Sequence, residues 1–143
     1  MLTKRKQKIR GLIMKVSAKE IEAMSNKGSK ERYIYSIKRI VDNEKAWVLD
    51  YDGFALSGIN GDNSEVLILW PAREYAANCA IDGWENYKPK ALSLDYIMDD
   101  LLPKLSSKGT QVGIFSVPGL SNTPVVDAES LLLDLEHECS NYM

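Results

Sequence analysis

The chain has very little of what enzymes most often use for nucleophilic or metal-assisted chemistry. Its 143 residues include one histidine, His137, and two cysteines, Cys79 and Cys139. A nucleophile needs a base within hydrogen-bond reach, but Cys139 lies two positions from His137, and residues two apart on a helix do not face each other. Zinc needs about four clustered ligands. We therefore expect a protein that is not an enzyme and that holds no metal and no cofactor.

Other common signatures are missing too. The sequence has no Walker-type phosphate loop and no GxGxxG turn before a helix. No apolar run approaches the roughly 20 residues of a membrane span, and the stretch "GLIM" near the start is too short for the core of a signal peptide. Two cysteines without a CxxC pair form no disulfide framework, which indicates a reducing compartment. These features predict a cytoplasmic protein that does not bind a membrane.

Basic residues are scarce beyond the start of the chain. Residues 1–15 contain six of the 18 basic residues and no acid, whereas residues 16–143 contain 12 basic and 20 acidic residues, a balance of −8. From Ala46 onward, five basic residues accompany 15 acidic ones, a balance of −10. An acidic body repels nucleic acid and attracts basic protein surfaces. We therefore expect a protein partner and no nucleic acid; the sequence does not indicate the oligomeric state.

The basic start has three interpretations. Four of its apolar residues have the helical spacing of a basic amphipathic helix, namely Ile9, Leu12, Ile13 and Val16. It could instead be a disordered arm, or residues 1–13 could be an upstream extension, because "MKVSAKE" reads like a natural beginning. We favour the last two interpretations. The expected organisation is a basic N-terminal extension over residues 1–15 and a single domain over residues 16–143.

Helical signals occur in five places. The capping box Ser17–Glu20 predicts a helix from Ala18, and apolar residues recurring every three or four positions predict a second helix from Lys30 to about Glu44. Three further starts are expected at Pro71, after Ser93 and after Asp127. The third of these five helices should end at Asp82-Gly83. Pro103 should kink or end the fourth.

Strand signals lie between these helices. Trp47, Leu49 and Tyr51 alternate with other residues, which suggests inward-facing side chains, and Asp52-Gly53 is a hairpin turn signal. The consecutive apolar residues of 66–70 suggest a strand buried on both faces. Further strands are expected at 111–117 and, as a short edge, at 123–126. The predicted fold is α+β: a three-stranded antiparallel meander plus a fourth strand, with helices packed on the sheet.

Loop aromatics and turn acids are the candidate binding residues. Trp84 and Tyr87 lie in the polar segment "GWENYKPK", and aromatic residues on loops are enriched at interfaces. The alternatives are that Trp84 folds back onto the core and that the acids are merely solvated turn residues, a hard-cation site being less favoured. The predicted partner-binding residues are Asp50, Asp52, Asp62, Trp84, Glu85 and Tyr87.

The segment from Arg32 to Leu135 resembles a bacterial family catalogued as domain of unknown function 2750. Four stretches carry the resemblance: "VDNEKAWVLDYDGFAL", "LILWPAREYAANCA", "DGWENYKPKALSLDYIMDDLLPKL" and "VGIFSVPG". The most specific part is Leu69-Trp70-Pro71 with Glu74-Tyr75-Ala76. The resemblance implies a small cytosolic α+β domain of bacteria and transfers no catalytic residue.

Two functional hypotheses follow. The first is a non-enzymatic protein-binding domain, most concretely a bacterial immunity protein that binds and blocks a cognate toxin, which could be a basic nuclease. Small acidic domains often have this role in bacteria, so this step is an analogy. The second is a small-molecule-binding or sensor domain of housekeeping role, with a pocket between the sheet and the Trp84 loop.

Overall fold

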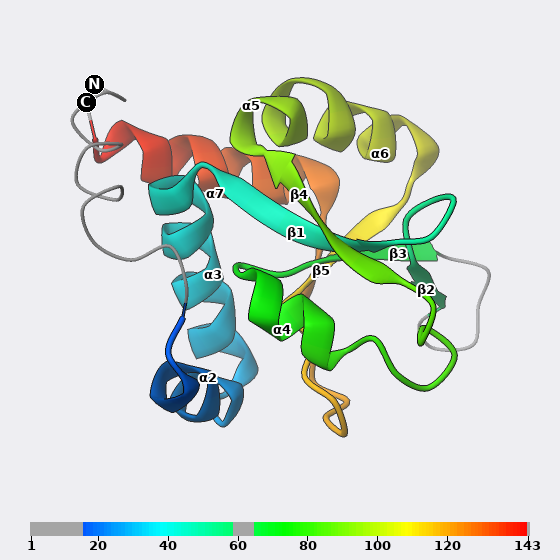
Figure 1. Ribbon diagram of the computed structural model, residues 1–143. Coiled ribbons are helices and arrows are strands. Elements are labelled where there is room, and N and C mark those ends of the chain that lie inside the picture. Colours follow the sequence, from blue (N-terminus) through cyan, green and yellow to red (C-terminus); the bar gives the residue numbers. More distant parts are fainter. Residues whose placement is uncertain (1–15, 59–64, 143) are drawn as a thin grey trace.

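The structure, a computed structural model, describes residues 16–58 and 65–142, and the labels used below are those of Figure 1. The elements follow in the order α2 (Ala18–Ser25), α3 (Ser29–Asn43), β1 (Lys45–Asp50), β2 (Leu56–Gly58), β3 (Glu65–Leu69), α4 (Arg73–Asn78), β4 (Lys88–Ser93), α5 (Leu94–Tyr96), the π-helix η1 (Ile97–Leu101), α6 (Leu102–Lys108), β5 (Gln111–Ile114), β6 (Val125–Asp127) and α7 (Ala128–Ser140). Strands and helices are intermixed without a repeated strand–helix–strand unit, so the predicted α+β class is confirmed.

The strands form two sheets that meet at one point. β1 pairs with β4 in an antiparallel ladder, and the larger sheet has the order β2-β3-β5-β6 with β3 and β5 parallel. Trp47 and Trp70 join the sheets, because each backbone N–H donates to the carbonyl oxygen of the other at 2.9 Å. In Figure 1 the ribbon of β1 and β4 crosses the larger sheet, with α5 and α6 above the ribbon and α4 below it.

The predicted meander is wrong in its strand arrangement. The chain does turn back after β1, since Ala55 N–H donates to Leu49 O at 2.9 Å, but the ladder partner of β1 is β4. β2 pairs with β3 as expected. β4 was predicted as a loop because it begins Lys-Pro-Lys, and strands are poor in these residues except at edges, where they block further pairing.

The predicted helix starts agree with the structure more closely than the predicted helix interiors do. Ser17 Oγ accepts from Glu20 N–H at 3.1 Å and Ser93 Oγ from Tyr96 N–H at 3.1 Å, so these two predicted caps are confirmed. The last helix does begin after Asp127, but the Asp127 side chain makes no capping hydrogen bond. The helix after Ser93 continues through Pro103, and the π-helical turns of η1 precede the proline. Proline has no N–H to donate, and a wider turn before it keeps the helix continuous.

The helix predicted from Pro71 begins two residues later. Ala72 is its N-cap with an extended backbone, and it ends at Asn78, before the Asp82-Gly83 turn. Trp70 is still bonded to β1, so Pro71 and Ala72 are needed to leave the sheet before the chain can coil. None of the helices in the described ranges is both long and apolar enough to cross a membrane.

One hydrophobic core connects both sheets and the helices around them. β3 is buried from Val66 onward, as its consecutive apolar residues predicted, and Trp70 is fully buried with its Nε1–H donating to Ser116 O at 3.0 Å. α3 and α7 pack against each other and against β5. This framework fixes the position of the segments on either side of the β1–β4 ladder.

Candidate functional site

The β1–β4 ladder brings two distant loops together. Asp50 at the end of β1 lies opposite Lys88 at the start of β4, so the turn after Asp50 meets the loop before Lys88. The rings of Tyr51 and Tyr87 have centroids 5.7 Å apart at an interplanar angle of 58°, and Trp84 lies 6.4 Å from Tyr87. We call the surface made by Asp50, Tyr51, Asp52, Trp84, Glu85 and Tyr87 the acidic-aromatic patch.

Local backbone geometry explains the shape of the first loop. Asp52 has φ 52° and Gly53 has φ 140°, both in the region that glycine adopts most readily. Tyr51 N–H donates to Gly53 O at 2.9 Å, which closes the turn tightly. The turn therefore projects the side chains of Tyr51 and Asp52 away from the core, and both are exposed.

The second loop is also built from tight turns. Asp82 has φ 52° and Gly83 has φ 103°. Gly83 N–H donates to Glu85 Oε1 at 3.0 Å, and Tyr87 N–H donates to Trp84 O at 3.0 Å. These bonds hold the loop in one conformation, so Trp84 and Tyr87 are presented without the entropy cost of ordering a flexible segment.

The patch combines rigid rings with solvated acids. Tyr51 is 55% exposed, Asp52 and Glu85 are exposed, and Trp84 and Tyr87 are half-buried because one side of each ring packs on the core. Two lysines lie beside it: Lys88 opposite Asp50, and Lys90, whose Nζ is 6.0 Å from the ring centroid of Phe54. The surface can therefore offer apolar contact, acceptors and a positively charged margin to a partner.

The structure gathers five of the six predicted site residues. Asp50, Asp52, Trp84, Glu85 and Tyr87 lie in the patch, and Asp62 lies outside the described residues. Trp84 packs against the core, as the alternative interpretation expected, and is still partly exposed. Their role in binding stays a prediction.

Tyr51 is the patch residue that sequence reasoning missed. Alternation with Trp47 and Leu49 assigned Tyr51 to the core, but only Leu49 is fully buried, whereas Trp47 is half-buried and Tyr51 is exposed. The inward positions of β1 are Ala46 and Val48, whose small side chains gave a weaker signal. The clue available in the sequence was the pair of aspartates that flank Tyr51.

A hollow of about 230 Å³ lies between Trp84 and the segment 116–120. The pocket expected from the sequence lay between the sheet and the Trp84 loop, whereas this hollow is lined by the Trp84 loop, the end of α4 and the loop after β5. The Cys79 thiol at its edge donates to Ser116 O at 3.2 Å, and burial raises the pKa of Cys79 to about 11. A thiol with a raised pKa is a poor nucleophile at neutral pH. Cys79 therefore does not give the hollow a reactive group at that pH.

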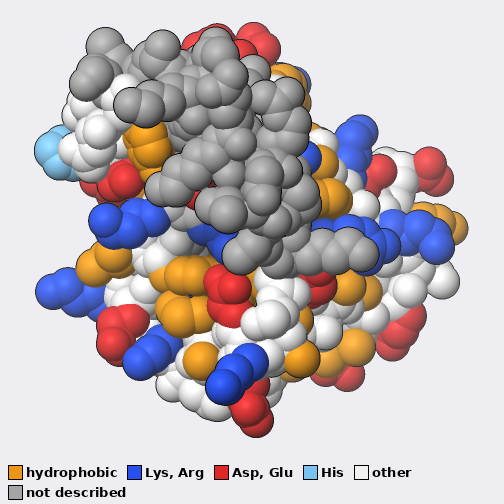
Figure 2. Space-filling model, turned by 60° about the vertical axis from the view of Figure 1, so that its left-hand side comes forward, with side chains coloured by type: hydrophobic (Ala, Val, Ile, Leu, Met, Phe, Trp, Pro, Cys, Tyr) orange, Lys and Arg blue, Asp and Glu red, His pale blue; other side chains and the backbone are white. Residues whose placement is uncertain are grey.

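Among the residues that the structure describes, the histidine and the acidic side chains are not clustered as metal ligands would be. His137 is exposed near the end of α7. Within residues 16–58 and 65–142, no three His, Cys, Asp or Glu side chains are gathered as metal ligands would be. On the part of the surface in Figure 2 that is not grey, acidic and basic side chains are interspersed.

Comparison with known proteins gives a family and nothing more specific. The family model described as "Protein of unknown function (DUF2750)" matches residues 33–135. No curated protein matches the chain.

Proposed function

Because the chain belongs to the DUF2750 family, whose function is unknown, we propose that it is a non-enzymatic protein-binding domain that uses the acidic-aromatic patch. Family membership assigns no activity, so the proposal rests on the surface itself. The observation that carries it is the meeting of Tyr51 with Tyr87 and Trp84, from loops more than 30 residues apart in the sequence.

The composition of the patch is typical of binding surfaces. Tyrosine and tryptophan dominate interface hot spots, because their large rings lose little conformational entropy on binding. Here the rings already contact one another and the loops are held by backbone bonds. A partner would therefore meet a preformed surface, which lowers the cost of association.

The charges favour a basic partner. Asp50, Asp52 and Glu85 belong to the same two loops and strand end as the rings, and the chain from Ala46 onward carries a balance of −10. Complementary charge speeds diffusional encounter and fixes orientation more than it adds affinity. Lys88 and Lys90 at the margin would restrict how a partner docks, because they repel its basic groups at that edge.

The most concrete form of the proposal is an immunity protein. Such a protein binds a toxin of the same cell and blocks its active site, and a nuclease toxin has the basic surface that the patch would complement. This step is an analogy with other small acidic domains of bacteria. A gene for a toxin next to the gene for this chain would support it.

The test is affinity purification of the tagged full chain from its native host, with mass spectrometry of what is recovered. We expect one partner in stoichiometric amount with a basic surface. The variant Asp50→Asn/Asp52→Asn/Glu85→Gln should recover at least about tenfold less of it. If the partner is a toxin, co-expression of the wild-type chain should restore growth and the variant should not.

A matched control tests whether the position of the lost charges, and not only their number, changes partner recovery. Asp95→Asn/Asp99→Asn/Asp100→Asn removes the same three charges from exposed positions of α5 and η1. This control should recover the partner like the wild type. Recovery of no stoichiometric partner, or equal recovery by the patch variant, would contradict the proposal.

A further inference from the structure

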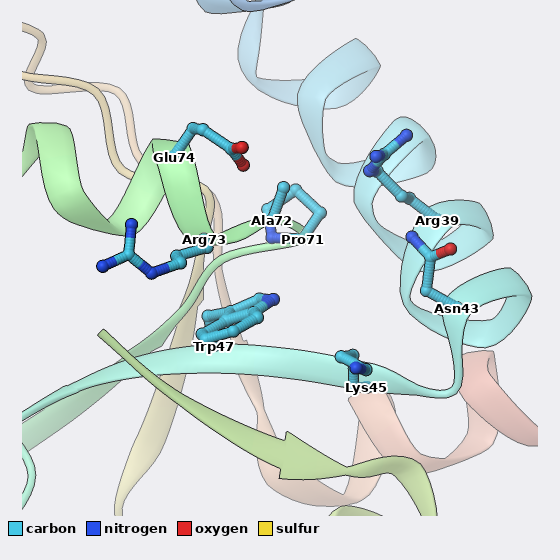
Figure 3. Close-up of a pocket in the computed structure, with 8 residues that line it drawn as sticks. All are labelled: Arg39, Asn43, Lys45, Trp47, Pro71, Ala72, Arg73 and Glu74. Carbon is cyan, nitrogen blue, oxygen red and sulfur yellow. The ribbon is translucent and has the colours of Figure 1, made fainter. Parts of the chain in front are cut away.

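A second cavity lies on the other side of α4 from the Trp84 loop. It has a volume of about 410 Å³ and opens between α3, the start of β1 and the junction of β3 with α4 (Figure 3). Its lining residues are Arg39, Asn43, Lys45, Trp47, Pro71, Ala72, Arg73 and Glu74. A volume of this size lies in the range of sites for small organic molecules, roughly 300–1,000 Å³.

The cavity concentrates positive charge in an acidic protein. Three of the 12 basic residues of 16–143 line it, namely Arg39, Lys45 and Arg73, and they come from three different elements. Glu74 is the only acid among the lining residues. Because the body as a whole has a balance of −8, this local excess of cations marks the cavity as a place where an anion is favoured.

Arg39 is held in position by a partly buried polar network. Its Nη1 lies 3.3 Å from Glu20 Oε2, and its side chain is 15% exposed. Glu20 also accepts from Tyr35 Oη at 2.6 Å, and the Tyr35 and Tyr75 hydroxyls are 2.9 Å apart. The guanidinium is therefore fixed before any ligand arrives, which is what a preorganised anion site requires.

One donor of Arg39 has no partner. The Nε atom is buried, and no acceptor in the described part of the chain lies within hydrogen-bond distance of it. Buried donors are almost always paired in native proteins, so this donor is an exception. Because Nε itself is buried, a bound molecule would contact Arg39 through the other side-chain atoms that line the cavity.

The floor of the cavity is aromatic and apolar. The half-buried indole of Trp47 lies along β1 below Pro71 and Ala72, and Glu74 and Arg39 face each other from opposite walls (Figure 3). The Trp47 backbone is pinned by its two bonds to Trp70. A flat ring could stack on the indole, while Asn43 and Glu74 could accept hydrogen bonds from polar groups of that ring.

We propose that this cavity binds a small organic anion that joins a flat ring to a phosphate or carboxylate. The ring lies on Trp47, and the anionic group takes hydrogen bonds and charge from Arg39 and Lys45. The Arg73 guanidinium, which extends away from these two residues in Figure 3, adds positive charge at the opposite edge of the cavity. This site is separate from the acidic-aromatic patch, and the proposal does not depend on the function proposed above.

The test is isothermal titration of the full chain with four probes. Adenosine 5′-monophosphate joins a ring to a phosphate and benzoate joins a ring to a carboxylate, while adenosine and inorganic phosphate each carry one half of the chemistry. At least one of the two joined probes should bind with a Kd below about 1 mM, and both halves should bind at least about tenfold more weakly.

Variants locate the binding within the chain. Lys45→Gln/Arg73→Gln should weaken binding of the better probe at least about tenfold, and both residues are solvent-accessible enough for the change to leave the fold intact. Lys104→Gln/Lys108→Gln removes two exposed charges from α6 and should leave the Kd unchanged. Binding of neither joined probe, equal binding of inorganic phosphate alone, or an unaffected cavity variant would each overturn the proposal.

Discussion

Arg32 is a buried cation that organises the loop after β5. It is fully buried in α3, and its guanidinium donates to Lys27 O at 2.9 Å and to Phe115 O, Asn122 O and Asn122 Oδ1 at 3.2 Å each. Burial lowers the pKa of Arg32 from its usual value, but an arginine stays protonated in proteins. Its hydrogen bonds to these uncharged oxygens tie the segment 115–122 to α3.

The first prediction concerns this residue. Arg32→Met would fill similar space but leave three backbone carbonyls without their donor, so we expect the free energy of unfolding to fall by about 3 kcal/mol. Urea denaturation measures this change in the free energy of unfolding. Lys38→Met, an exposed position of the same helix, should change stability by less than about 0.5 kcal/mol. A loss below about 1 kcal/mol for Arg32→Met would show that the network contributes little.

The second prediction concerns the buried thiol of Cys79. Its pKa is about 11 in the folded chain against 9.0 for an unperturbed thiol. The thiolate therefore forms more readily in the unfolded chain, and stability that is complete below pH 9 is lost as the pH rises toward 11.

The variant Cys79→Ala isolates this effect from that of the buried tyrosines, whose pKa values are also raised by burial. Unfolding free energies measured by urea denaturation between pH 9 and 11 should fall more steeply for the wild type than for the variant. Equal slopes for the two proteins would contradict the environment described for Cys79.

Individual residues were predictable where their environment follows from nearby sequence. Trp84 and Tyr87 stood out because they are aromatic in a polar loop. Tyr51 was misjudged, because its alternation with Trp47 and Leu49 predicted an inward-facing side chain and the structure leaves it exposed. The sequence analysis made no prediction for Arg32, whose burial depends on hydrogen bonds to residues 115 and 122, far away in the sequence.

At the scale of elements, the turn after β1 determines where Tyr51 and Asp52 point. Gly53 has φ 140°, and a side chain there would be strained whatever the free space around it. The third prediction is that Gly53→Ala lowers the free energy of unfolding by about 1–2 kcal/mol.

The matched control is Asp52→Asn in the same turn. Asparagine tolerates the φ of 52° found at Asp52, so this variant should stay within about 0.5 kcal/mol of the wild type. Thermal or urea unfolding of both variants makes the comparison. Equal stability of Gly53→Ala and the wild type would show that the turn is not constrained as described.

Element positions were largely predictable, but their pairing was not. Caps, turns and apolar runs located α2, α3, β3 and the start of α5, since each signal is local. The parallel pairing of β3 with β5 and the pairing of β1 with β4 join segments about 40 residues apart. Such pairing depends on how distant segments pack in three dimensions. β4 was not predicted at all, because its Lys-Pro-Lys start is typical of a loop.

At the scale of the whole molecule, charge distribution governs how partners approach. The fourth prediction is that association with the protein partner slows with salt, because acidic side chains of the patch steer a basic surface and ions screen them. Raising ionic strength from about 0.05 to about 0.5 M should lower the association rate at least about tenfold. Stopped-flow mixing measures the rate.

The patch variant gives the control for this prediction. Asp50→Asn/Asp52→Asn/Glu85→Gln should associate more slowly at low salt and depend less on ionic strength. An association rate that is independent of salt, or equally dependent in the variant, would mean that these acids do not guide the encounter.

The central claim is that the acidic-aromatic patch is the protein-binding surface, and Tyr51 tests it most directly. Tyr51 is 55% exposed, so its removal should spare the fold, and Leu133 on α7 at 60% exposed is a matched control. The measurement is the Kd of the purified partner for Tyr51→Ala, Leu133→Ala and wild-type chains. We predict that Tyr51→Ala weakens binding about thirtyfold, as loss of a hot-spot aromatic does, and that Leu133→Ala leaves it unchanged. A Kd for Tyr51→Ala within about twofold of the wild-type value would contradict the account.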